Sequence, residues 1–432
     1  MEGNDAFRVL GFKLTLVFLF FRLSLIHELI AAKLGINTYV LYITGVPAIG
    51  ALLFAGGLRR SFSARAMWFW AAFCACIAVG APFSLWPGAS VLEVLGFMRT
   101  ELMTGLLIAG MVLTWGEVTS LMNVFAMAAL VNIAIGKLLS GDAGGRLQLD
   151  VQGGVISNSN DYAAHLTLMI PFLLIVVFTK RRAFLVRAGA LLFCFYALYL
   201  ILSTGSRGGS LALIAGVLYG IARMPARYRI IAAVALPIGA GAVFAALPSE
   251  TADRLASLFK SEPTAAAQTD EAAASAENRS QLLKRSIELT FQHPVLGVGM
   301  GQFQIADGAA ARAEGHHGLW HETHNAYTQV SSETGIPALL FYLAALVSTF
   351  IMLNRLLRNA RRQQPTPENQ TIIIATLCVL LSLTMFSVAI TFLSLAYRFY
   401  LPAFTGLAIA MTRAANRQWN AAAAVVPARS FR

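Results

Sequence analysis

Charge is what this sequence has least of. Aspartate, glutamate, lysine and arginine make up 12% of its 432 residues, 57% of the residues are hydrophobic, and the mean hydropathy is +0.66. A soluble protein of this size cannot bury so much apolar surface. The composition therefore excludes a soluble enzyme and predicts a polytopic membrane protein.

Cysteine is also scarce, and a cleavable leader is not evident. Four cysteines lie inside apolar stretches, at Cys74, Cys76, Cys194 and Cys378. This placement argues against a disulfide framework and a thiolate metal site, and favours packing roles. No small-residue cleavage site follows the first apolar stretch, so we expect the chain to be inserted intact.

Apolar runs long enough to cross a bilayer as helices recur along the chain. Twelve are predicted, near residues 9–29, 38–57, 66–82, 98–115, 118–136, 161–179, 184–203, 209–223, 230–247, 336–354, 371–392 and 398–412. Arginine and lysine cluster in alternate connections, as the positive-inside rule requires of cytoplasmic loops. The net charge of +12 therefore reflects topology better than a nucleic-acid partner.

These patterns predict an all-α polytopic membrane protein with about twelve transmembrane helices and one large helical loop on the outer side. The first nine spans occupy residues 1–247, the loop domain 248–335, and the last three spans with a cytoplasmic tail 336–432. Side chains suited to chemistry lie in the outward connections, so we expect the active site on that face.

Within the long loop, a stretch from Ser261 to Ala276 is expected to be mobile or loosely helical. Asn278 is expected to cap a helix that ends before Pro294, with an apolar stripe formed by Leu282, Leu283, Ile287 and Phe291. Arg279 would then lie in the first helical turn, where backbone N–H groups favour an anion. The following run, Gly297-Val298-Gly299-Met300-Gly301, is predicted to be a flexible turn.

Two further basic residues accompany Arg279 in this helix. For Lys284 and Arg285 the favoured interpretation is a solvated basic face, and Arg285 is retained as a candidate substrate-binding residue. For Arg279, anion binding and a solvated face are equally supported by the local pattern.

A glycine-rich connection, Ser203-Thr204-Gly205-Ser206-Arg207-Gly208-Gly209-Ser210, joins two apolar spans on the outward face. Backbone amides around Gly205, Ser206 and Gly208 can approach a ligand closely, and Arg207 offers a fork of donors suited to phosphate. The alternative is an interfacial turn whose arginine reaches lipid headgroups. The cost of placing one arginine between membrane helices favours the functional interpretation.

Four histidines, His316, His317, His321 and His324, precede the tenth apolar run. Their spacing is not the zinc signature His-Glu-x-x-His, so one working histidine is favoured over a metal site. His324 is the candidate general base, with Asn325 holding its ring and Tyr327 following. Structural roles are the default for His316 and His317.

The motifs Thr204-Gly205-Ser206-Arg207-Gly208, Asn278-Arg279, His293-Pro294-Val295-Leu296-Gly297-Val298-Gly299, Thr323-His324-Asn325-Ala326-Tyr327 and Glu333-Thr334-Gly335-Ile336 resemble, in order and spacing, the O-antigen ligase and polymerase superfamily. The resemblance implies a metal-independent, inverting glycosyltransferase of the GT-C class without a cofactor. Its essential arginines fall on Arg207 and Arg279, its essential histidine on His324, and a loosely defined asparagine on Asn160 as a substrate-binding candidate.

The activity implied by this resemblance is transfer of a polysaccharide from undecaprenyl diphosphate to an acceptor sugar hydroxyl of lipid A-core. The protein would be a multi-pass component of the bacterial inner membrane, in contact with membrane lipids, with its site facing the periplasm and no nucleic-acid partner. The alternative is a polymerase of the same superfamily that uses a growing glycan as acceptor. A glycoprotein oligosaccharyltransferase and a transporter of lipid-linked sugars are further alternatives.

Overall fold

Helices make up nearly all of the structure, a computed structural model that describes residues 3–139, 141–143, 146–148, 156, 158–224, 226–256, 267–315 and 321–425. The first half contains α1 (Gly3–Ser24), α2 (Ile26–Leu34), α3 (Val40–Phe54), α4 (Gly57–Ser61), α5 (Arg65–Gly80), η1 (Ala81–Phe83), α6 (Pro87–Gly96), η2 (Phe97–Leu102), α7 (Met103–Met111), α8 (Trp115–Leu139), α9 (Ser159–Phe178) and α10 (Phe184–Ser203). The second half contains α11 (Arg207–Arg223), α12 (Ala226–Ala245), α13 (Ser249–Ala256), α14 (Ala267–Gln292), α15 (Phe303–Ala313), α16 (Ala326–Arg362), α17 (Pro367–Ala389), η3 (Ile390–Phe392) and α18 (Tyr400–Val425).

The expected helical class is confirmed, with one small addition. A short antiparallel hairpin pairs β1 (Gly141–Ala143) with β2 (Arg146–Gln148) in a connection that we expected to be a loop. Three-residue strands of this kind are too short to form a core of their own. The hairpin is therefore a small addition to a helical protein and does not change its fold class.

Six helices of the described chain are long and apolar enough to cross a membrane, and a bent pair makes a seventh. Each of the twelve predicted runs is helical over most of its length, but the prediction of twelve crossings is not confirmed by this count. Helix α3 shows why: it has 15 residues, which reach ~22 Å against a hydrocarbon thickness of about 30 Å. A run that reads as one span can thus fold as a shorter helix.

The first apolar run is broken where one straight span was expected. Leu25 adopts a left-handed conformation (φ 56°), and α1 meets α2 at a bend of 58°. The carbonyl of Leu23 lies 2.9 Å from the side-chain nitrogen of Asn132 and 3.0 Å from Nε2 of His165. Buried polar side chains from α8 and α9 therefore satisfy the backbone that the break exposes, and His165 is a packed core residue.

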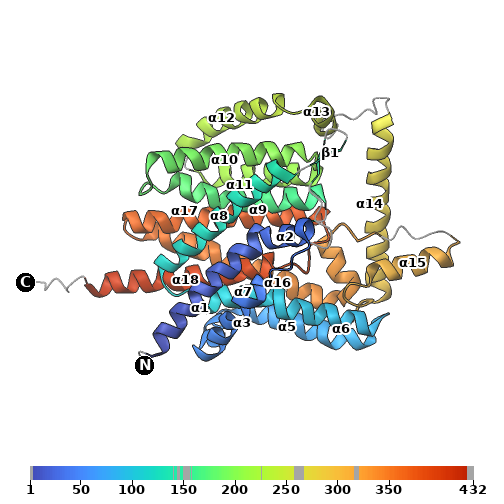
Figure 1. Cartoon of the computed structure of the whole chain (residues 1–432), viewed down its shortest axis with the longest axis horizontal. Coiled ribbons are helices and arrows are strands. Elements are labelled where there is room, and N and C mark those ends of the chain that lie inside the picture. Colours follow the sequence, from blue (N-terminus) through green and yellow to red (C-terminus); the bar gives the residue numbers. More distant parts are fainter. Residues whose placement is uncertain are drawn as a thin grey trace, which may run out of the picture.

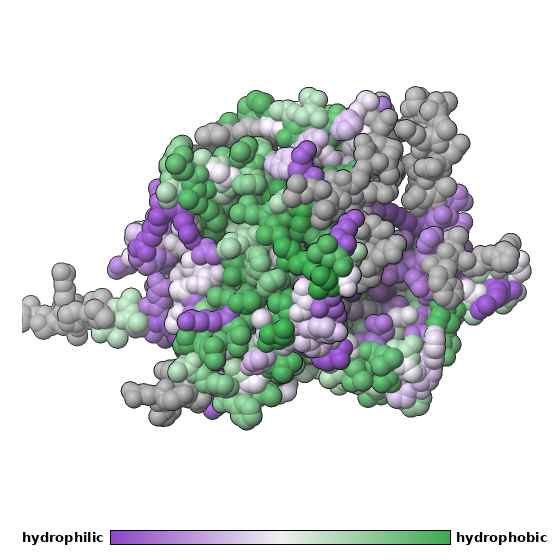
Figure 2. All heavy atoms as spheres, viewed as in Figure 1, coloured by the Kyte–Doolittle hydropathy of each residue, from purple (hydrophilic) through white to green (hydrophobic). Residues whose placement is uncertain are grey.

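The two ends of the bundle differ in what they carry. In Figure 1 both termini lie at one end, whereas α14 crosses the opposite ends of the long helices, beside α13 and α15. Figure 2 shows apolar side chains over the middle of the bundle and hydrophilic side chains toward its ends. This arrangement matches a membrane bundle with its one large loop on the side away from the termini.

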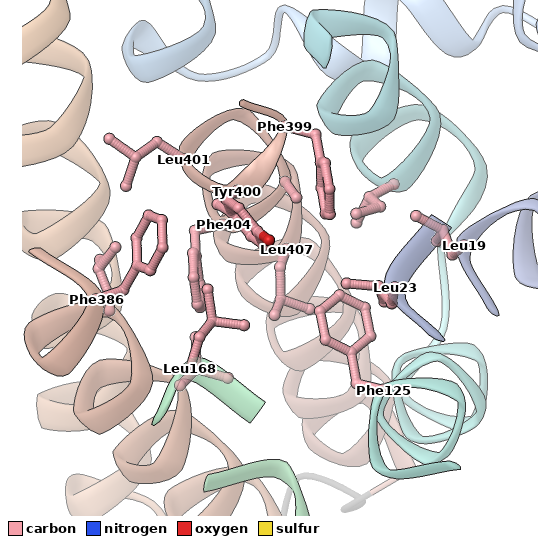
Figure 3. Packing of buried hydrophobic residues seen from close by; sticks show 14 of the residues in the cluster. Leu19, Leu23, Phe125, Leu168, Phe386, Phe399, Tyr400, Leu401, Phe404 and Leu407 are labelled. Atoms are coloured by element: carbon pink, nitrogen blue, oxygen red, sulfur yellow. The ribbon is translucent and has the colours of Figure 1, made fainter. Parts of the chain in front are cut away.

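Part of the core gathers around the start of α18. Figure 3 shows Phe399, Tyr400, Phe404 and Leu407 of this region meeting side chains from four other helices, namely Leu23 of α1, Phe125 of α8, Leu168 of α9 and Phe386 of α17. All of these side chains are buried. The connection that leads into α18 is consequently held in place by the core, and it is this connection that meets the residues described next.

Candidate active site

His324 lies in a short extended segment immediately before α16, with an unusual backbone. Its φ is 51°, in the left-handed region that residues other than glycine enter infrequently and that asparagine, aspartate and histidine enter more often than the rest. The backbone N–H of His324 donates to the hydroxyl of Ser394, 2.9 Å away. The hydrogen bond to Ser394 therefore fixes the backbone that carries the imidazole.

The imidazole of His324 is kept neutral by its surroundings. Burial first, and then the positive charges of Arg279 and His321, lower the pKa of His324 to about 4. The rings of His321 and His324 lie 6.3 Å apart, and His321 is the exposed member of the pair. A neutral imidazole at physiological pH can accept a proton, which a general base requires.

Asn325 and Tyr327 are tied to the start of α16. The side-chain oxygen of Asn325 accepts hydrogen bonds from the backbone N–H groups of Tyr327 (3.0 Å) and Thr328 (3.1 Å), so Asn325 is the N-cap of the helix. The hydroxyl of Tyr327 donates to the carbonyl of Ser387 on α17 at 3.0 Å. Asn325 thus fixes the chain that follows His324, whereas we had expected it to hold the imidazole ring.

Arg279 reaches the neighbourhood of His324 from the middle of α14. The helix runs from Ala267 to Gln292, so the expectations that Asn278 caps it and that Arg279 occupies its first turn are wrong. The expected stop before Pro294 is confirmed. Arg279 is half-buried, and its charge acts on His324, so its guanidinium rather than free helical N–H groups would attract an anion.

The buried face of α14 also differs from the predicted stripe. Leu282 and Leu289 are buried with Ser286, whereas Leu283, Ile287 and Phe291 are exposed. Thr290 of α14 lies 2.7 Å from Ser331 of α16, hydroxyl to hydroxyl. This buried polar contact sets the position of α14, and with it Arg279, against the helix that His324 precedes.

The glycine-rich run after α14 is a clamp, not the flexible turn that we expected. The backbone N–H of Val298 donates to the carbonyl of Ser332 (2.9 Å), and that of Gly299 to the carbonyl of Glu333 (2.8 Å). In the other direction, the backbone N–H of Ile336 donates to the carbonyl of Pro294 (2.8 Å). Gly335 has a φ of 82° and interrupts α16 there with a kink. We call residues 294–301 with 332–336 the kink clamp.

The kink clamp leaves no room for side chains at its two central glycines. A Cβ on Gly297 would collide with the backbone of Glu333, and one on Gly335 with the carbonyl of Val295. The carboxylate of Glu333 is buried and accepts the backbone N–H groups of Gly301 (3.0 Å) and Phe303 (3.3 Å). Two motifs far apart in the sequence are therefore one structural unit.

Arg207 is the first residue of α11, after a tight turn. Gly205 has a φ of 61°, and the hydroxyl of Ser206 accepts the N–H of Gly209 at 3.2 Å as the N-cap. Gly208 faces Phe392, where an added Cβ would lie 3.0 Å from the phenylalanine side chain. Arg207 is half-buried, at a turn that brings its backbone close to the connection before α18.

The connection from η3 to α18 joins these pieces, and the sequence had not indicated it as part of the site. Phe392 packs against the Arg207 turn at Gly208, and Ser394 binds the backbone of His324. Two residues span at most ~7 Å, so the Arg207 turn and the His324 segment both contact one short stretch of chain. Only the fold reveals Ser394, because a serine in an apolar turn has no distinctive pattern.

The start of α9 lies at the same place. Gly209 faces the methyl group of Ala163, and the charge of Asp161 acts on Glu322, which lies within hydrogen-bonding reach of Ser394. Asn158 is the N-cap of α9; its side-chain oxygen accepts the N–H of Asn160 at 2.8 Å. Asn160 is half-buried at this end of the helix.

Arg285 pairs with acidic side chains of the loop domain. Its guanidinium forms ion pairs with Glu288 (3.2 Å), Asp307 (3.6 Å) and Glu314 (2.8 Å), all within the loop domain. These contacts tie α14 to α15 and its C-terminal end. The anion-binding part of the site consequently does not depend on Arg285.

Two of the four histidines, His316 and His317, lie outside the described residues. Among the residues that the structure describes, no group of three or more histidine, cysteine, aspartate or glutamate side chains is arranged to hold a metal ion.

Comparison with known families identifies the region that carries this site. Residues 192–343 match the family model described as O-antigen ligase. The resemblance to the O-antigen ligase superfamily is confirmed. The O-antigen ligase match encloses Arg207, Arg279 and His324 and leaves Asn160 outside. It supports a glycosyltransferase-like enzyme associated with a membrane and with lipid-linked glycans. A search of curated proteins found no match.

Proposed function

We propose that the protein is a glycosyltransferase that joins a polysaccharide carried on undecaprenyl diphosphate to a sugar hydroxyl of lipid A-core. The observation that carries the proposal is a neutral, half-buried imidazole beside the charge of Arg279, within the region that matches the O-antigen ligase family. The fold supports it by bringing the Arg207 turn to the same connection that holds His324.

In the proposed reaction, the acceptor hydroxyl attacks the anomeric carbon of the donor sugar. A bond forms between the acceptor oxygen and this carbon, and the bond from the carbon to the diphosphate oxygen breaks with inversion of configuration. His324 takes the hydroxyl proton, and the diphosphate leaves as an anion. A diphosphate is a good leaving group, so the enzyme's main tasks are to hold its charge and to activate the hydroxyl.

Arg207 and Arg279 are the proposed ligands of the diphosphate. A guanidinium donates paired hydrogen bonds that match phosphate oxygens, and Arg207 stands at the start of α11, where backbone N–H groups also favour an anion. Gly205, Ser206 and Gly208 would let the diphosphate approach this backbone. Binding the donor would also neutralise part of the charge that depresses the pKa of His324, and so make it a stronger base.

The proposed setting is the bacterial inner membrane, with α14 and α15 on the periplasmic side and about twelve helices crossing in all. The positive-inside pattern of the loops supports this orientation. The polyprenyl tail would lie among outer-leaflet lipids beside α11, and α14 would cover the sugars. Tyr327, Asn325 and Asn160 are proposed to shape the acceptor side.

The test is a transfer assay with purified protein, undecaprenyl-diphosphate-linked glycan and lipid A-core, with and without chelator. We expect glycan on lipid A-core in both conditions. Glycan appearing only on the donor lipid as a longer chain would identify a polymerase, and loss of product with chelator would contradict the metal-independent mechanism. Membrane translocation of the donor without any new bond would contradict the proposal as a whole.

A further inference from the structure

At the end of the bundle that carries both termini, three arginines converge on the C-terminal turn of α7. They come from α1, α4 and α18, and each donates to a backbone carbonyl: Arg8 to Met111 (3.1 Å), Arg60 to Gly110 (2.7 Å) and Arg413 to Ala109 (2.6 Å). Cations complement the exposed carbonyls and the negative end of a helix. One helix end therefore gathers three guanidinium groups that are distant in sequence.

The positive charge gathered there is larger than its counter-charge. Arg417, exposed on α18, also acts on Arg60, and burial followed by the charges of Arg8 and Arg417 lowers the pKa of Arg60. In the described part of the chain, the carboxylate that pairs with this group is Glu117, 2.8 Å from Arg8. We call Arg8, Arg60, Arg413 and Arg417 the arginine cluster; it has a surplus of positive charge.

Unsatisfied hydrogen-bond donors occur on the arginine cluster and on residues close to it in the sequence. Within the described residues, the buried atoms without a hydrogen-bond partner include Nε of Arg8 and a terminal nitrogen of Arg60, together with the indole nitrogens of Trp115 and Trp419 and the hydroxyl of Thr412. Four of the five are donors only, and a hydroxyl can donate. Buried donors without acceptors are costly, so the region lacks acceptors as well as negative charge.

An apolar surface adjoins the arginine cluster. Phe54 and Leu58, which precede Arg60 at the end of α3 and in α4, are 78% and 36% exposed. Tryptophans are common where a bilayer meets water, and Trp115 and Trp419 occur beside Glu117 and Arg417 in the sequence. Positive charge beside exposed apolar side chains suits a ligand with an anionic head and hydrocarbon chains.

We propose that the arginine cluster binds the phosphate of an anionic phospholipid in the leaflet at the terminal end of the bundle. The phosphate oxygens would accept hydrogen bonds from the guanidinium groups and from the neighbouring donors, and the acyl chains would pack against Phe54 and Leu58. Free phosphate shares the first part of this chemistry but not the second. The site lies at the opposite end of the bundle from the O-antigen ligase site and does not depend on it.

The experiment titrates purified full-length protein in neutral detergent with phosphatidylglycerol, phosphatidylcholine or inorganic phosphate, and measures bound lipid by native mass spectrometry. The variant is Arg417→Gln, because Arg417 is exposed and its replacement leaves the contacts to α7 in place. The matched control is Arg358→Gln, which removes an exposed arginine near the end of α16. Thermal melting checks that both variants are folded.

We expect phosphatidylglycerol to bind in preference to phosphatidylcholine, and Arg417→Gln to weaken that binding about fivefold, the effect of one basic residue on an anionic lipid. Arg358→Gln should leave it unchanged. Equal losses in the two variants would show a diffuse charge effect and overturn the site. Equal binding of both lipids, or competition by inorganic phosphate at concentrations similar to the lipid, would also overturn the proposal.

Discussion

The properties of His324 arise from three separate causes that converge on one side chain. Its backbone is held in the left-handed region at φ 51° by the contact to Ser394, and its ring is neutral because burial and then Arg279 lower its pKa. Left-handed backbone at a side chain other than glycine costs of order 1–3 kcal/mol. The contact to Ser394 helps to maintain this conformation.

The first prediction separates the ring of His324 from its backbone. Asparagine tolerates the left-handed region well, so His324→Asn should keep the fold and its melting temperature while removing the base. We expect the transfer rate to fall about 10²- to 10⁴-fold, as for loss of a general base. His321→Asn is the matched control and should retain most of the activity. A His324→Asn enzyme with near-normal turnover would contradict the assigned role.

The second prediction concerns pH. A base must be neutral to work, and a pKa of about 4 keeps His324 neutral far below the ordinary histidine value of 6.5. We expect kcat/KM, which reports the free enzyme, to stay level as pH falls from 8 to about 5 and to decline with a midpoint near 4. In Arg279→Gln the residual activity should decline at a higher pH, because a charge that lowers the pKa is gone. A midpoint at 6.5 or above in the wild type would contradict this environment for His324.

At the scale of elements, the kink clamp explains why two glycine motifs distant in sequence occur together. The run around Gly297 binds the backbone at Gly335, and this contact joins the end of α14 to the middle of α16. Arg279 and His324 belong to these two helices or precede them directly. Their approach therefore depends on backbone contacts that no other residue type could make at these positions.

The third prediction tests the clamp with two glycines of positive φ. Gly335 and Gly315 have φ values of 82° and 80°, but a Cβ on Gly335 would collide with backbone, whereas nothing lies within 4 Å of one on Gly315. We expect Gly315→Ala to cost about 1 kcal/mol through its backbone conformation alone. Gly335→Ala should cost roughly a further 1–3 kcal/mol, because its ψ is 170° and because the added methyl group has no room. Thermal melting in detergent measures both. Equal losses would mean that the clamp is not closely packed.

The element scale also shows what the sequence could and could not predict. The helical runs, the end of α14 before Pro294 and the set of site motifs were all visible in spacing and composition. The true start of α14 was not, because Ser261–Ala276 has no apolar stripe and helix propensity alone is a weak signal. Ser394 and the partnership of Gly297 with Gly335 depend on contacts between distant segments, which local patterns do not contain.

At the scale of the whole molecule, the bundle separates two kinds of chemistry. The candidate active site lies at the end covered by α14, and the arginine cluster lies at the end that carries both termini (Figure 1). The alternation of basic loops predicted this polarity. The number of crossings was less accessible, because an apolar run predicts a helix but not whether that helix is straight and long enough to span.

The fourth prediction tests the polarity. A cysteine would be added at each of two exposed positions, Ala309→Cys in α15 and Asn359→Cys near the end of α16, and the wild-type chain would measure any labelling of the four native cysteines. A membrane-impermeant maleimide should label the first in intact cells whose outer membrane has been permeabilised, and the second only after lysis. The reverse pattern would place the candidate active site on the cytoplasmic side.

The claim on which the account depends most is that Arg207, Arg279 and His324 serve one reaction in one pocket. The direct measurement is the rate of glycan transfer from undecaprenyl diphosphate by Arg207→Gln, Arg279→Gln and His324→Asn, with Arg312→Gln, an exposed arginine of α15, as the control. We predict losses of about 10²-fold or more in each of the three and near-normal rates in the control, all with unchanged melting temperatures. Full turnover in any one of the three folded variants would contradict the claim.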